Sequence, residues 1–204
     1  MEEKVLTEKE SLELISQMIQ ATKKNRAVSP GKELLYWGYF TSILALTIYL
    51  LIRFTSSGIW SWGWMLMFVF WGFSFFVHKR EKTVVTYIDK TIGQVWQVLG
   101  WMFVITFWVV AIFGAIYGRE DFILMMPLSL LYCGLGISIT GIIVREPWMI
   151  YPPLLSFTIC FYMLQVLVIS HYATNLWNLL FGLSFVVTYI IPGHIINKKS
   201  KVKC

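Results

Sequence analysis

Apolar blocks of about 20 residues alternate along the chain with short polar connections. The blocks lie at 34–53, 58–77, 93–117, 122–144, 152–171 and 175–196. A helix of this length crosses the hydrocarbon core of a bilayer, which is roughly 30 Å thick. Runs such as MFVITFWVVAIF are apolar on every face, whereas a barrel strand would alternate apolar and polar residues. The sequence therefore predicts an all-α polytopic membrane protein with six transmembrane helices.

The segment ahead of the first block is polar and has the rhythm of a short helix. Thr7 and Glu10 form a capping box, and Leu12, Ile15 and Ile19 recur at helical spacing to give one apolar stripe. We interpret the stripe as a partner-binding surface, or as a face that docks on the ends of the spans. A position on the inner leaflet is the third alternative, but five glutamates within the first 13 residues oppose it because that surface is negative.

These patterns divide the chain into three parts. Residues 1–31 would form a cytoplasmic amphipathic helix and linker, residues 32–197 a six-helix transmembrane domain, and residues 198–204 a basic cytoplasmic tail. The first 30 residues lack the apolar core of a cleavable signal peptide, so we expect the first span to serve as the insertion signal.

Basic residues predict the orientation of the spans. Of the 17 Lys and Arg residues, only Arg53, at the end of the first block, and Arg119 would lie outside if the N-terminus is inside. Cytoplasmic connections carry an excess of Lys and Arg, so both termini are predicted to be cytoplasmic.

The amino-acid composition supports the assignment to membrane proteins and explains the positive net charge. The chain is 57% hydrophobic and 14% charged, against about 45–50% and about 25% in a typical soluble domain. The net charge of +6 comes from residues between the apolar blocks, so it indicates membrane orientation and no nucleic-acid partner. Cys133 and Cys160 lie within blocks and are expected to be small core side chains.

Few residues are candidates for chemistry, and we predict no catalytic, cofactor-binding or metal-binding residue. No Asp, Glu, Lys, Arg or His falls mid-span, which argues against a proton-coupled transporter or an ion pump. Ser138 and His194 are the only pair that an intramembrane hydrolase of the rhomboid type could use. However, Ile139 replaces the second glycine of that serine motif, and His194 lies at the cytoplasmic edge.

One polar face precedes and enters the third block. Lys90, Gln94 and Gln97 are spaced i, i+4 and i+7, so they share a helical face, and Gln165 in the fifth block is a further amide with long reach. The structural interpretation is an interhelical hydrogen bond made by Gln97. The functional interpretation is a polar cavity that opens to the cytoplasm.

Small residues and prolines predict how the helices pack. Gly134, Gly136 and Gly141 allow close approach of a neighbouring helix, either within the chain or in a homodimer. The Pro192-Gly193 pair is expected to kink or end the sixth span near the inner surface.

Three stretches resemble a known group of proteins. The segments ESLELISQMIQATKKN, YWGY and TYIDKTIGQVW are similar to those of an uncharacterised family of small six-span bacterial inner-membrane proteins. The resemblance implies a bacterial inner-membrane location, and it implies no activity, ligand or site residue.

The leading hypothesis from sequence is a non-enzymatic structural, accessory or regulatory membrane component. Its expected partners are membrane lipids together with a second copy or another membrane or cytoplasmic protein. The alternatives are a small permease or transporter subunit that uses the polar cavity, and an intramembrane hydrolase.

Overall fold

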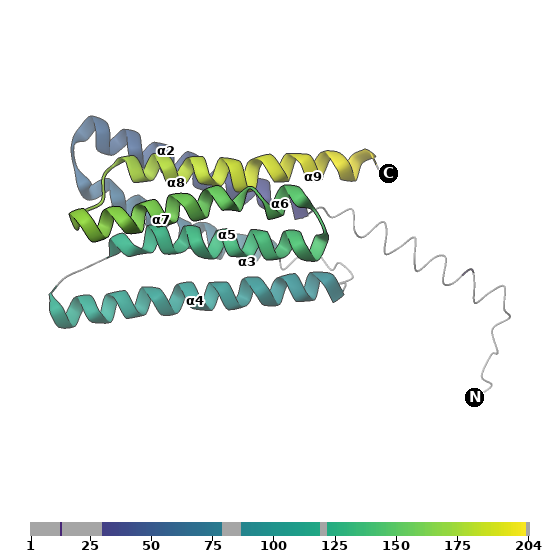
Figure 1. Ribbon diagram of the computed structural model, residues 1–204, viewed down its shortest axis with the longest axis horizontal. Coiled ribbons are helices and arrows are strands. Elements are labelled where there is room, and N and C mark those ends of the chain that lie inside the picture. The colour runs from purple at the N-terminus through teal and green to yellow at the C-terminus, as the bar shows by residue number, and fades with distance from the viewer. Residues whose placement is uncertain (1–12, 14–29, 79–86, 119–121, 203–204) are drawn as a thin grey trace.

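The computed structural model describes residue 13 and residues 30–78, 87–118 and 122–202 (Figure 1). Its elements are α2 (Pro30–Thr55), η1 (Gly58–Met65), α3 (Leu66–His78), α4 (Tyr87–Tyr117), η2 (Phe122–Leu124), α5 (Met125–Val144), α6 (Pro147–Ile150), α7 (Pro153–Ser170), α8 (Leu176–Phe185), η3 (Val186–Ile190) and α9 (Ile191–Val202). No strand occurs among these described residues, so the all-α prediction is confirmed for them.

Among the described residues, five helical segments are long and apolar enough to cross a membrane: Gly31–Thr55, Tyr87–Tyr117, Phe122–Val144, Pro147–Ser170 and Leu176–Lys199. They coincide with five of the six predicted blocks. The remaining block, 58–77, forms the 3₁₀-helix η1 followed by the 13-residue helix α3, instead of one long α-helix. The coarse prediction of a helical protein with several membrane-spanning helices therefore agrees with the structure.

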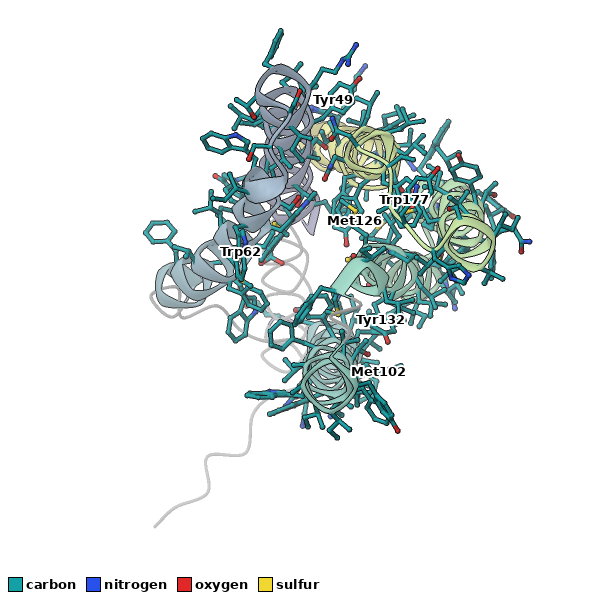
Figure 2. The ribbon with its side chains drawn as sticks, turned by 90° about the vertical axis from the view of Figure 1, so that its left-hand side faces the viewer. Tyr49, Trp62, Met102, Met126, Tyr132 and Trp177 are labelled. Carbon is teal, nitrogen blue, oxygen red and sulfur yellow. The ribbon has the colours of Figure 1, made fainter. Side chains whose placement is uncertain are left out.

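The long helices lie side by side with alternating direction, and α4 occupies the edge of the bundle (Figure 1). Helices α2, α5, α7, α8 and α9 enclose most of the core, whose fully buried side chains include Leu130, Ile137, Met163 and Trp177. Seen from the end where α2 leads into η1, α4 and its Met102 stand at the margin, whereas Trp177 lies among the inner helices (Figure 2). Only 11% of the most apolar stretch of α4 is buried, against 28–50% for the other four.

Glycines of α5 let three neighbours pack closely. A Cβ atom at Gly134 would lie 2.7 Å from the ring of Phe157 on α7, and one at Gly136 would lie 2.8 Å from the ring of Trp96 on α4. At Gly141 it would lie 2.7 Å from Cβ of Met149, the buried residue of α6. All three glycines therefore serve packing within the chain, which is the first of the two alternatives that the sequence left open.

The last helix does not end at Pro192-Gly193, contrary to one of the two outcomes expected there. Helix α8 continues through the π-helical turn η3 into α9. Within this turn the N–H of Ile191 donates to the carbonyl of Val186, five residues earlier. The wider turn provides a break in the regular hydrogen-bond ladder just before Pro192, which has no N–H of its own to contribute.

The two terminal parts of the predicted organisation are described only in part. Of the predicted N-terminal helix, only the exposed and helical Glu13 is described. At the other end, α9 continues through Lys198 and Lys199 to Val202, so the described part of the basic tail is helical.

Candidate functional site

The polar residues that the sequence singled out do not gather in one place. Lys90, Gln94 and Gln97 lie on α4 and Gln165 lies on α7, and all four side chains are exposed. Helix α5 packs against both α4 and α7 and lies between them (Figure 1). Within the described residues, no hydrogen bond joins the four side chains. The cytoplasm-facing cavity therefore stays a prediction.

The two other sets of candidates are equally separate. Leu12, Ile15 and Ile19 lie outside the described residues. Ser138 donates a long hydrogen bond of 3.4 Å to the carbonyl of Ile150, and the ring of His194 is 2.7 Å from the hydroxyl of Tyr39. Each member of the proposed hydrolase pair thus has a different partner.

The structure instead builds a polar cluster at the end of the bundle where α2 leads into η1. The buried Asn178 of α8 accepts a hydrogen bond of 3.1 Å from the indole N–H of Trp64 on η1. Its amide nitrogen donates to the side-chain oxygen of Asn175 at 3.1 Å, and the amide nitrogen of Asn175 donates to the carbonyl of Tyr49 on α2. Two amides therefore fasten η1 and α2 to the start of α8.

Sequence reasoning missed this amide cluster. Its only signal is the segment NLWN, which places Asn175 and Asn178 three residues apart at the start of the sixth block and hence on one helical face. Trp64 is half-buried, and its ring packs edge-on against Phe181 with centroids 4.9 Å apart.

A second polar contact joins α7 and α8 in the core. The hydroxyls of Ser156 and Ser184 are 2.5 Å apart, and both side chains are buried. The buried hydroxyl of Thr188 donates to the carbonyl of Ser184, and Ser42 on α2 donates to the carbonyl of Gly182. Each of these hydroxyls therefore has a hydrogen-bond partner within the bundle.

Stacked aromatic rings run from the amide cluster into the bundle along α8 and η3. Phe181 stacks on Phe185 with centroids 5.1 Å apart, and Phe185 stacks on Tyr189 at 4.7 Å. The buried Tyr189 lies beside Cys133 on α5. Large side chains therefore fill the space between α8 and its neighbours.

Two polar contacts hold α9 at the opposite end of the bundle. Tyr39 of α2 pairs with His194, and Lys199 forms an ion pair with Glu146, which precedes α6. Gly193 brings the backbone of α9 close to α2, since a Cβ atom there would lie 2.9 Å from Cγ of Leu35.

These contacts define what the arrangement can do chemically. Among the described residues, no three His, Cys, Asp or Glu side chains gather as a metal site requires. The polar groups at the two ends and in the core connect different helices, so their geometry is that of interhelical fastening. Comparisons with protein-family models, curated proteins and solved structures return no match for this chain.

Proposed function

We propose that the chain is a non-enzymatic component of a bacterial inner membrane, with a structural, accessory or regulatory role that it performs through protein contacts. The observation that carries the proposal is the packing of the core, in which buried serine and threonine side chains have partners and aromatic side chains fill the space between helices. The buried hydroxyls of Ser156 and Ser184 pair between α7 and α8, and stacked aromatic rings fill the space beside α8. An interior held in this way suits a stable platform in the membrane.

Six crossings are part of the proposal, and the length of the second segment supports them. A 3₁₀-helix rises about 2.0 Å per residue and an α-helix about 1.5 Å, so η1 and α3 together extend about 35 Å. This exceeds the roughly 30 Å of the hydrocarbon core. The 3₁₀ stretch thus compensates for the shortness of α3.

Cytoplasmic ends are also proposed, and the described basic residues support them. Lys32, Lys90, Arg145 and the lysines of α9 belong to helix ends that lie together at one end of the bundle, whereas Arg53 belongs to the opposite end (Figure 1). This asymmetry agrees with the excess of Lys and Arg on the cytoplasmic side.

The contact surface in this proposal is the N-terminal stripe of Leu12, Ile15 and Ile19. A photo-reactive amino acid placed at Ile15 or Ile19 in the full chain, in living cells, should form an adduct with a second protein chain. Gln17 is the matched control, because it lies near the opposite face of the predicted helix. Adducts only with lipid or within the chain, or equal adducts at Gln17, would overturn the proposal.

A further inference from the structure

The glycines within helices divide into two groups according to their surroundings. Those of α5 are filled by neighbouring side chains, as described above. Gly93 and Gly100 on α4 differ, since a Cβ atom at either position would meet nothing within 4 Å. A glycine in a helix costs about 1 kcal/mol relative to alanine and here serves no packing within the described chain. Such open glycines allow the backbone of another helix to approach.

Gln97 lies between the two open glycines on the same face of α4. The positions 93, 97, 100 and 104 follow the alternating spacing of four and three residues that forms a seam between helices, and all four residues are exposed. Within the described residues, the amide of Gln97 has no hydrogen-bond partner.

The depth of Gln97 makes its exposure significant. The neighbouring residue Trp96 contacts Gly136 and donates to Thr140 on α5. Thr140 and Gly136 precede Arg145, the residue that caps α5, by roughly 7 and 13 Å along the helix axis. Gln97 is therefore level with the apolar part of α5, where lipid tails offer an amide no hydrogen bond.

We propose that this seam of α4, formed by Gly93, Gln97, Gly100 and Val104, is the interface with a second copy of the chain. Two copies inserted in the same orientation and related by a twofold axis along the membrane normal bring each residue to the level of its own counterpart. The amide of Gln97 carries both a donor and an acceptor, so it is complementary to itself. The glycines at either side let the two α4 helices come close enough for that bond.

A second copy is favoured over lipid as the occupant for two reasons. Lipid tails would leave the Gln97 amide without a partner, and they gain nothing from the open backbone at Gly93 and Gly100. The proposal depends on α4 crossing the membrane and is independent of the contacts proposed for the N-terminal segment. Failure of one therefore leaves the other standing.

The test measures self-association of the full chain in lipid vesicles, by energy transfer between labelled copies across a range of protein-to-lipid ratios. Gln97→Leu should weaken dimerisation by about three- to thirty-fold, the range given by single interhelical hydrogen bonds in membranes. Gly100→Leu should weaken it by blocking the approach of the backbones. Val98→Leu is the matched control, because Val98 is exposed on another face of the same helix.

A second measurement locates the interface directly. With Cys204 replaced by serine, Gly100→Cys should form a disulfide-linked dimer in vesicles under mild oxidation, whereas Val98→Cys should not. A chain that stays monomeric at every ratio would overturn the proposal. So would equal weakening by Val98→Leu, or cross-linking through Val98→Cys in preference to Gly100→Cys, which would move the contact to another face.

Discussion

The indole N–H of Trp96 on α4 donates a hydrogen bond to the hydroxyl of Thr140 on α5, with 3.2 Å between Nε1 and Oγ1. The hydroxyl of Thr140 donates in turn to the carbonyl of Gly136, against which the ring of Trp96 packs. Trp96 therefore both forms a hydrogen bond and packs closely at the same place on α5. These contacts attach α4, the least buried of the long helices, to the core of the bundle.

Removing the hydroxyl of Thr140 should weaken this attachment. Thr140→Val keeps the side-chain shape and leaves the Trp96 N–H without its acceptor. We expect the free energy of unfolding in detergent micelles to fall by about 0.5–2 kcal/mol, the range for interhelical hydrogen bonds in membranes. Thr158→Val is the control, since the exposed Thr158 bonds only to the carbonyl of Leu154 in its own helix. An equal loss in both variants would show that the interhelical bond contributes nothing.

The filled and open glycines should respond in opposite ways to alanine. At Gly141 the added Cβ atom would lie 2.9 Å from the backbone carbonyl carbon of Met149. We therefore expect Gly141→Ala to destabilise the fold by about 1–3 kcal/mol, as overpacking does. At Gly72 on α3 nothing lies within 4 Å, so Gly72→Ala should be neutral or stabilise by up to about 1 kcal/mol. Thermal unfolding of the two purified variants decides the matter, and a more stable Gly141→Ala protein would contradict the packing described for α5 and α6.

The Ser156–Ser184 pair should behave as one unit. Either Ser156→Ala or Ser184→Ala leaves a buried hydroxyl without its partner and should cost about 1–3 kcal/mol. The double variant should cost clearly less than the sum of the two, because it leaves no orphaned hydroxyl from this pair. A double-mutant cycle on unfolding free energies provides the measurement, and strict additivity would mean that the two hydroxyls do not interact.

The ion pair between Lys199 and Glu146 should contribute little. Its side chains are 47% and 22% exposed, so water and salt screen the attraction. We expect Lys199→Met to lower the unfolding free energy by under about 1 kcal/mol, with the difference vanishing as salt is raised. A larger, salt-independent loss would show that Lys199 supports α9 through packing of its aliphatic chain.

Much of the helical layout could be predicted from the sequence, because the cost of exposing backbone to lipid requires long apolar helices. The predicted block 122–144 matches Phe122–Val144, and the block 93–117 lies within α4. The 3₁₀ stretch of η1 could not be predicted in the same way, because GIWSWGWM is as apolar as its neighbours. The contact of its Trp64 with Asn178 joins residues far apart in the sequence, so the local pattern does not indicate it.

The arrangement of the helices in space was beyond the sequence for a different reason. Gln97 and Gln165 could line one cavity only if α4 and α7 were neighbours. The periodicity of a sequence does not indicate which helices pack against each other. The structure places α5 between α4 and α7. Likewise, the glycines of α5 and those of α4 are indistinguishable as letters, and only the surrounding side chains separate the filled positions from the open ones.

We propose that η1 and α3 together cross the membrane, which makes six spans. Cysteines introduced one at a time at Ser57 and Thr83 flank this segment, in a parent chain in which Cys204 is replaced by serine and whose Cys133 and Cys160 give the background. A membrane-impermeant maleimide should label Ser57→Cys in cells with a permeabilised outer membrane, and should label Thr83→Cys only after the inner membrane is opened. Labelling of both positions from the same side would contradict the crossing and leave five spans.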